Sequence, residues 1–214
     1  MRSLLARPLL CGVALEAALA CAASPARAER LTQAEAERLD AGAIVVRPQV
    51  LEEGDARYVG GVSYAIVSAD VDDLASVFDD VGAYTELLPR TKRARLVGEN
   101  EGARYIELSQ GNSVLSTSYT IRLRHDRAGR VVRFRLDPSH PHPALRDAWG
   151  FFRYEPIPND PSRVLLTYGV LADLGAGVVR DLFEDKVRTI MLTVPELVQR
   201  YVARRGRRAP TASR

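Results

Sequence analysis

The fold prediction for this chain rests on residues 71–89, "VDDLASVFDDVGAYTELLP". Apolar residues recur there at helical spacing, at Val71, Leu74, Val77, Phe78 and Val81. Tyr84, Leu87 and Leu88 form a second apolar cluster directly afterwards, and Pro89 ends the helical segment. The stretch therefore predicts two short helices whose apolar faces cover one end of a larger apolar surface.

After Pro89 the spacing of apolar residues changes from a helical period to alternation. Residues 117–126, "TSYTIRLRHD", place Tyr119, Ile121 and Leu123 on one face and arginines on the other. Strands of this kind are predicted at 93–99, 103–110, 117–126, 130–138, 147–156 and 162–172, and two earlier ones at 43–50 and 57–69. Consecutive strands with one apolar and one polar face indicate an antiparallel sheet.

The last predicted element is a long helix. Its apolar residues recur at steps of three or four, at Val179, Phe183, Val187, Ile190, Val194, Leu197 and Tyr201. Pro195, within "TVPE", predicts a kink or a restart. No other predicted element is large enough to cover the apolar face of the sheet, and because sheets curve, a space should remain beneath the helix. The predicted fold class is α+β, a curved antiparallel sheet wrapped around a long C-terminal helix.

Four parts are expected along the chain. A leader occupies residues 1–28, an N-terminal extension of one helix and one strand 29–57, the main domain 58–204, and a basic disordered tail 205–214. In the extension, Thr32 and Glu35 have the spacing of a capping box at a helix start.

The leader has the pattern of a secretory signal peptide. Arg2 and Arg7 precede an apolar stretch, and "SPARA" predicts cleavage after Ala28, with export to the periplasm or cell envelope. The alternative is a lipoprotein box, "ALAC" at 18–21, with a lipid anchor at Cys21. Both cysteines lie in this leader, so a chain cut after Ala28 has none for disulfides, nucleophilic catalysis or metal binding.

The distribution of charge limits the kinds of partner. The formal charge of +3 falls to +1 once the leader, with three arginines and one glutamate, is removed. Six arginines and no acid lie from Arg200 onward, so residues 29–199 carry −5. An acidic body argues against nucleic acid as a partner. The basic tail suits peripheral contact with an anionic membrane, and the alternative is a solvated chain end.

The order of elements, from "VSYAIVSADVDDLASVFDDVGAYTELLP" to the final helix, resembles the START-like superfamily, also called SRPBCC or helix-grip. It is most similar to the polyketide cyclase/dehydrase and coenzyme Q-binding START-like branch. The matching positions are Tyr84, Leu87, Leu88 and Pro89 after the first helix, and Gly150, Phe152 and Pro156 in a later strand. The family's usual tryptophan in the first helix is replaced by Val77 and Phe78. The resemblance covers residues 58–204 and implies a helix-grip fold with an internal cavity for an apolar ligand, in carriers, sensors or enzymes alike.

Histidines give one weak metal-binding pattern. His140 and His142 lie two residues apart between prolines, and Asp137 and Asp147 are the acids nearby in sequence. No third ligand is evident, so a polar loop is preferred and neither a metal nor a cofactor is expected. His125 is expected to be solvated, because it ends a strand beside a turn.

No nucleophile elbow, zinc-protease motif or phosphate-binding glycine loop is present in the sequence. Acid–base help to a ring-closing reaction would fall to Glu107, Tyr119, Arg146 and Asp147. The preferred interpretation of the Arg146–Asp147 pair is an ion pair that holds the edge of the sheet.

The preferred function is an exported domain that binds an apolar small molecule or lipid, such as a lipid, isoprenoid or polyketide-like molecule, without chemistry. The alternatives are an aromatase/cyclase-type enzyme for a polyketide-like substrate, and an envelope protein whose cavity is collapsed. Alternation separates Trp149 and Phe151 from Phe152 and Tyr154, and Trp149 is assigned to the cavity floor. The expected lining residues are Tyr84, Leu87, Leu88, Ile106, Leu108, Tyr119, Ile121, Phe134, Trp149, Leu182, Phe183 and Val187.

Overall fold

The computed structural model describes residues 30–111, 116–140, 145–175 and 178–208. Contacts divide the chain into Met1–Leu31 and Thr32–Arg214, and every helix and strand given below belongs to the second unit. The predicted leader, with its cleavage point after Ala28 and the alternative anchor Cys21, lies outside the described residues.

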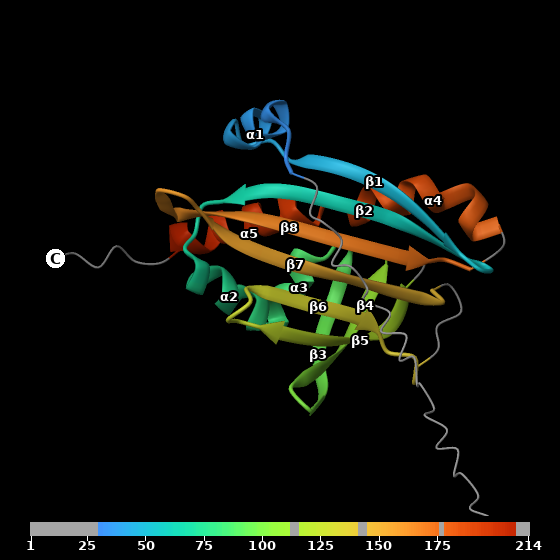
Figure 1. The fold of residues 1–214 in the computed structure, drawn as a ribbon. Helices are drawn as coiled ribbons and strands as arrows, with labels where there is room; N and C mark the ends of the chain where they lie inside the picture. The colour runs from blue at the N-terminus through green and yellow to red at the C-terminus, as the bar shows by residue number, and fades with distance from the viewer. Residues whose placement is uncertain (1–29, 112–115, 141–144, 176–177, 209–214) are drawn as a thin grey trace, which may run out of the picture. The chain divides into compact units, whose positions relative to one another are not determined.

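Eight antiparallel strands form one sheet in the order β1-β2-β8-β7-β6-β5-β4-β3 (Figure 1). Strands that follow one another in sequence are paired, except β2 and β3. Instead β2 pairs with β8, so β3 lies at the far edge of the sheet from β1. The strands are β1 (Val45–Glu53), β2 (Ala56–Val67), β3 (Thr91–Asn100), β4 (Ala103–Gly111), β5 (Ser116–Asp126), β6 (Val131–Leu136), β7 (Asp147–Ile157) and β8 (Asp160–Asp173). The predicted N-terminal extension contributes β1 to this same sheet, paired along β2.

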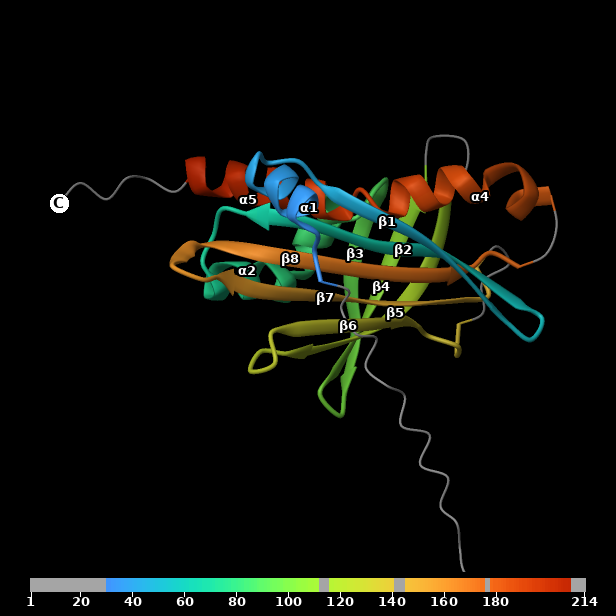
Figure 2. The same cartoon turned by 45° about the horizontal axis from the view of Figure 1, so that its top comes forward.

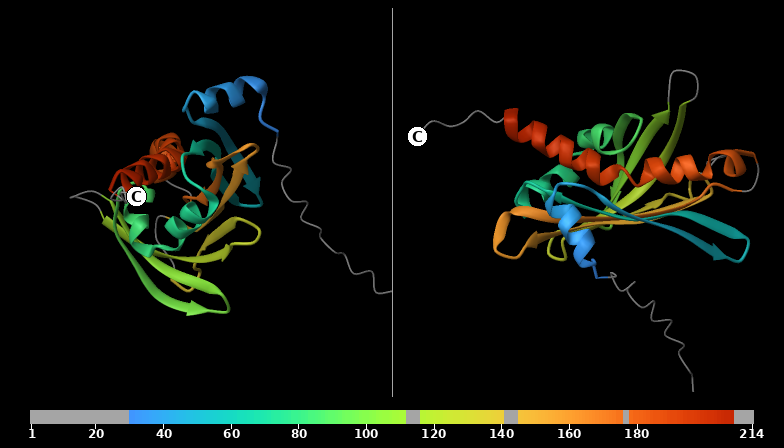
Figure 3. Two further views of the ribbon diagram at one scale, coloured as in Figure 1. Left: turned by 90° about the vertical axis from the view of Figure 1, so that its left-hand side faces the viewer. Right: turned by 90° about the horizontal axis from the view of Figure 1, so that it is seen from above.

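The helices are α1 (Gln33–Asp40), α2 (Val71–Asp79), the short 3-10 helix η1 (Val81–Ala83), α3 (Tyr84–Leu87), α4 (Val178–Met191) and α5 (Val194–Arg208). The sheet curves around α2, α3 and the C-terminal pair, and α4 and α5 follow one another across its concave side (Figures 2 and 3). The other helix, α1, packs against β1 and β2. The predicted fold class, α+β with a curved sheet around a long C-terminal helix, is confirmed.

The stretch at 71–89 folds because its polar residues cap helices while its apolar residues face the sheet. The Asp70 carboxylate accepts a hydrogen bond from the Asp73 amide at the start of α2, at 2.7 Å. The Asp80 carboxylate does the same for η1 through the Gly82 amide, at 2.9 Å. Leu74 and Phe78 are fully buried, so these short helices are held by packing rather than by their own stability.

The long C-terminal helix is interrupted where Pro195 predicts it. α4 ends at Met191, and α5 begins at Val194 with Pro195 in its first turn, where a missing N–H costs nothing. The break also changes which residues face the sheet. Val198 is fully buried, whereas Leu197, on the predicted stripe, is only half-buried.

At the break between α4 and α5, the Thr193 hydroxyl donates to the Ile190 carbonyl at 2.7 Å, as at a helix end.

One prediction at the C-terminal end needs correction. The predicted disordered tail begins too early, because α5 continues through residues 205–208. Arginine is a good helix former, and positive charge near a helix C-terminus is favourable.

Two side-chain contacts fix the C-terminal helices to β2. The Gln199 amide donates to the Ile66 carbonyl at 2.8 Å, and Glu184 forms an ion pair with Arg57 at 3.0 Å.

Among the described residues, no helix is both long and apolar enough to cross a membrane.

Candidate functional site

A cavity of about 610 Å³ lies between the concave face of the sheet and α4, and it is partly open to solvent. Its wall comes from β4 to β8, the end of α3, α4 and the first residue of α5. The described lining residues are Tyr84, Leu88, Pro89, Arg90, Leu108, Gln110, Gly111, Thr117, Tyr119, Ile121, Leu123, Phe134, Leu145, Ala148, Phe152, Tyr168, Val170, Ala172, Leu174, Val187, Ile190, Met191 and Val194. Most of these side chains are apolar.

The cavity occupies only part of the concave face. On β8 the inward residues Val164 and Leu166 are fully buried in the core, whereas Tyr168 and the inward residues after it line the cavity. The division coincides with the helices, because α2 and α5 pack on one part of the sheet and α4 spans the other. A solid core and an internal space therefore share one continuous sheet face.

An aromatic cluster forms the boundary between core and cavity. The Phe152 ring lies 4.8 Å from that of Tyr168 and 4.8 Å from that of Phe78 in the core, measured between centroids. Phe134 stacks on Tyr168 with centroids 6.2 Å apart. Gly150 makes room for Phe134, since a Cβ built there would lie 2.5 Å from the Phe134 ring. The cluster closes the inner end of the cavity with rigid rings.

Polar groups in the cavity wall are mostly bonded to the protein. The Tyr84 hydroxyl donates to the Phe78 carbonyl at 2.9 Å, and the Tyr119 hydroxyl donates to Gln110 Oε1 at 2.8 Å. Gln110 in turn donates to the Pro89 carbonyl at 3.2 Å and to the Thr91 hydroxyl at 2.9 Å. These bonds join the end of α3 to β4 and β5 around the cavity.

The phenols in the wall are uncharged. Burial raises the pKa of Tyr84 and of Tyr119 well above the usual value for tyrosine. Burial raises the pKa of Tyr168 as well, and the nearby Tyr119 adds to the effect. All three hydroxyls therefore remain protonated at physiological pH.

Seven of the residues expected at the cavity line it, and these are Tyr84, Leu88, Leu108, Tyr119, Ile121, Phe134 and Val187. Leu87 and Ile106 are instead fully buried in the core and do not reach the cavity. Ile106 precedes Leu108 by one inward position on β4, which places it on the core side of the boundary. The side chains of Leu182 and Phe183 lie outside the described part of the chain.

Trp149 was assigned to the cavity floor, and this assignment is wrong. Its side chain is 39% exposed, and it lies on the face of β7 opposite to Phe152 and Tyr154, which are buried. Alternation correctly separated the two aromatic pairs, but the prediction chose the outward pair. Ala148, which shares the inward face, takes the place in the cavity wall that Trp149 was expected to fill.

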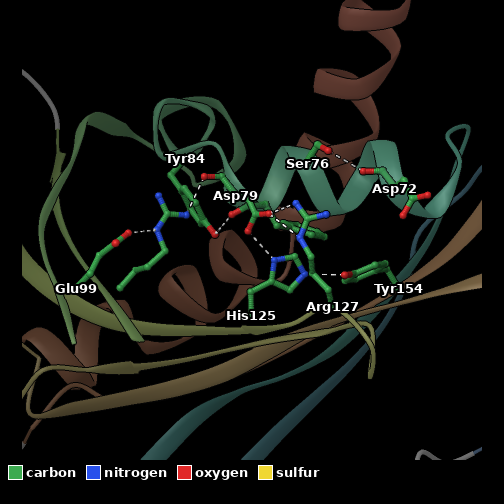
Figure 4. A network of polar contacts seen from close by, with 10 residues as sticks. Asp72, Ser76, Asp79, Tyr84, Glu99, His125, Arg127 and Tyr154 are labelled. Atoms are coloured by element: carbon green, nitrogen blue, oxygen red, sulfur yellow. Dashed lines mark hydrogen bonds and ion pairs between the residues drawn. The ribbon is translucent and has the colours of Figure 1, made fainter. Parts of the chain in front are cut away.

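A polar network lies on the core side of the boundary, where α2 meets the sheet (Figure 4). His125 contacts the Asp79 carboxylate through Nδ1 at 2.7 Å and the Tyr154 hydroxyl through Nε2 at 2.6 Å. Arg127 donates to the same carboxylate through Nε at 3.0 Å. Burial alone would raise the pKa of Asp79, but the bonds from His125 and Arg127 outweigh it and hold that pKa below its usual value.

His125 was expected to be solvated, but its side chain is only 6% exposed. Its partners come from α2 and β7, distant in sequence, so no local pattern identifies them. The Tyr154 hydroxyl is buried and held by His125, and Tyr154 does not line the cavity. The network therefore holds α2 on the sheet rather than acting on a ligand.

The four acid–base candidates are not brought together. Tyr119 lines the cavity, but Glu107 pairs with Arg95 at 3.0 Å, and Asp147 pairs with Arg135 at 2.9 Å, all four on the outer face of the sheet. Arg146 is exposed.

The histidine pattern does not assemble a metal site among the described residues, where no group of three possible ligands occurs. His140 contacts Asp137 at 2.9 Å and is 67% exposed. His142 lies outside the described residues.

Comparison with known proteins gives structural matches only. No family model matches the chain, and no curated protein matches it. The STAR-related lipid transfer protein from Xanthomonas axonopodis superposes with a TM-score of 0.60 at 18% identity, covering 75% of this chain and 93% of that one. The Zhui aromatase/cyclase from Streptomyces sp. R1128 superposes with a TM-score of 0.56 at 22% identity, covering 72% of this chain and 98% of that one.

A START superfamily protein from Mycobacterium smegmatis also matches, with a TM-score of 0.55 at 13% identity, covering 67% of this chain and 96% of that one. Identities this low establish the architecture and not the activity. The resemblance inferred from the order of elements is confirmed at the level of the fold. The curved sheet, the helices on its concave side and these neighbours together show that this chain has the START-like, or helix-grip, fold.

Proposed function

We propose that this domain binds an apolar small molecule or lipid in the cavity under α4 and performs no covalent chemistry on it. The observation that carries the proposal is a space of about 610 Å³ with a mostly apolar wall, which is within the range of small-molecule sites. Two of the structural neighbours are named as a lipid transfer protein and an aromatase/cyclase, which is consistent with an apolar ligand.

Transfer of apolar surface from water would drive binding. Burying roughly 300 Å² of ligand surface is worth about 7 kcal/mol before ordering costs, at about 25 cal/mol per Å². After those costs, affinities in the micromolar range or weaker are expected.

An aromatase/cyclase-type enzyme remains the second candidate, favoured by the name of one structural neighbour. We place it second because a general acid or base should titrate near the working pH. Tyr119 is the one acid–base candidate in the wall, and burial moves its pKa further from neutrality.

For the location of the protein, we propose export to the periplasm or cell envelope with cleavage after Ala28, and a lipid anchor at Cys21 as the alternative. The basic C-terminal tail is proposed as a peripheral contact with anionic lipid. The intact mass of protein extracted from its own host distinguishes the two leaders. A mass that begins at Met1 would contradict both.

Native mass spectrometry of protein purified from its own host tests the proposed function. We expect a non-covalent adduct that disappears under denaturing conditions. The control is Ala148→Phe, which places a ring in the cavity from the inward face of β7 and should carry no adduct. An adduct retained in full by the folded Ala148→Phe protein would show that the ligand binds elsewhere.

A further inference from the structure

The Tyr168 hydroxyl differs from the other polar groups of the cavity. Tyr168 lies on the inward face of β8, lines the cavity and is 3% exposed. Among the described residues its hydroxyl has no hydrogen-bond partner, although its ring contacts Phe134 and Phe152. The hydroxyl is not among the described polar atoms that are fully shielded from solvent, so it is accessible from the cavity, where a ligand can bond to it.

Other polar side chains in the same wall are engaged. The Tyr84 hydroxyl donates to the Phe78 carbonyl, and the Tyr119 hydroxyl donates to Gln110. The Gln110 amide in turn donates to the Pro89 carbonyl and to the Thr91 hydroxyl. Thr117 also has an interaction partner. Tyr168 is thus the buried donor that the described wall leaves available to a ligand.

The position of Tyr168 defines which part of a ligand it meets. Its ring belongs to a cluster of three, in which Phe134, Phe152 and Tyr168 each contact the other two, at the inner end of the cavity next to the core. Tyr168 lines the cavity and its hydroxyl is not shielded from solvent, so a ligand in the cavity can reach that hydroxyl. Arg90 is the one cation among the described lining residues. It is exposed and lies in the turn between α3 and β3.

We propose that the ligand presents a neutral hydrogen-bond acceptor, such as a ketone or quinone carbonyl, to the Tyr168 hydroxyl at its inserted end. An apolar chain inserted there would leave the hydroxyl unpaired. A carboxylate there would be a buried charge with no described cation beside it, which is strongly unfavourable. The ring cluster of Phe134, Phe152 and Tyr168 at this end of the cavity favours a flat, ring-containing body. This inference rests on the proposed function and narrows its ligand class.

A matched pair of probes tests the inference. Fluorene and 9-fluorenone share one ring skeleton, and fluorenone adds a carbonyl acceptor. Each is titrated in competition with the fluorescent probe N-phenyl-1-naphthylamine, on wild type and on Tyr168→Phe. The ratio of the two dissociation constants should shift against fluorenone by about 2- to 12-fold in Tyr168→Phe, as expected for the loss of one neutral hydrogen bond.

Tyr105→Phe is the control, because it removes the hydroxyl of a tyrosine on the outward face of β4 that does not line the cavity, and the ratio should not change. The melting temperature of Tyr168→Phe should equal or exceed that of wild type, since no protein bond is lost. A clear fall in that temperature would mean that the hydroxyl has a protein partner, which overturns the inference. An unchanged ratio with both probes bound overturns it as well and leaves the proposed function standing. If neither probe binds wild type, the proposed function fails together with the inference.

Discussion

At the scale of single residues, Asp79 shows how one carboxylate organises several elements. It accepts bonds from His125 and Arg127, and its own backbone carbonyl accepts one from Arg104 at 2.8 Å. These donors come from β5, the turn after it and β4, so one residue at the end of α2 anchors that helix to the sheet. The arrangement explains why a short helix keeps a fixed place next to the cavity.

Asp79→Asn should lower the free energy of unfolding by about 1–3 kcal/mol, because it removes a charged acceptor from His125 and Arg127. The pKa of Asp79 is lowered in the folded state, so its contribution is present above the usual carboxyl pKa and is lost as pH falls through the lowered value. Denaturation of both proteins from pH 7 to pH 2 measures this. A difference that is constant across that range would contradict the linkage.

The sequence predicted some residues of the site and missed others for physical reasons. Alternation identifies the two faces of β7 but not which face meets α4, so Trp149 was exchanged for its inward neighbour Ala148. Ile106 and Leu108 have the same pattern and the same face. What separates core from cavity is which helix covers each part of the sheet, with α4 over the cavity and α2, α3 and α5 over the core. That arrangement is a property of the tertiary structure and not of local sequence. The contact between Asp79 and His125 could not be predicted either, because the two residues are far apart in sequence.

At the scale of elements, β7 has a glycine at the place where the Phe134 ring of β6 packs. Gly150 faces inward, and a Cβ there would approach the Gly169 carbonyl to 2.2 Å and the Phe134 ring to 2.5 Å. The sequence indicated this position only through the resemblance. The structure gives the reason, since the Phe134 ring lies over the place that a side chain would fill.

Gly150→Ala should therefore destabilise the protein by about 1–3 kcal/mol through overpacking, and should also weaken binding of apolar probes because Phe134 must move. Gly98→Ala in β3 is the control, since a Cβ there has no neighbour closer than 4.0 Å. Chemical denaturation measures both variants. Equal losses would mean that the close approach at Gly150 is relieved without cost.

The break between α4 and α5 makes a second prediction at this scale. Val198→Ala should cost about 2 kcal/mol for the buried methyl groups removed, and Leu197→Ala should cost less although it removes a larger side chain. Thermal or urea denaturation compares the two. A greater loss of stability for Leu197→Ala would mean that Leu197, and not Val198, packs against the sheet, as the sequence predicted for one uninterrupted helix.

At the scale of the whole molecule, one sheet serves two purposes. The part under α2, α3 and α5 is a packed core that stabilises the fold, and the part under α4 keeps an apolar space. The order of elements, the sheet and its helical cover were predictable because they follow from periodicity over long segments. The depth of the cavity was not, since it depends on how the interrupted C-terminal helix lies across the curved sheet.

The central claim is that apolar molecules enter this cavity, and Leu88 tests it most directly. Leu88 lines the cavity from the end of α3, whereas Val97 on β3 is 45% exposed and does not line it. N-phenyl-1-naphthylamine is titrated into wild type, Leu88→Asn and Val97→Asn, with melting temperatures confirming that each is folded. The account predicts saturable binding to wild type and Val97→Asn, and affinity at least about fivefold weaker for Leu88→Asn, because an amide in the apolar wall must be desolvated. Equal affinity for all three folded proteins would contradict the placement of the ligand under α4.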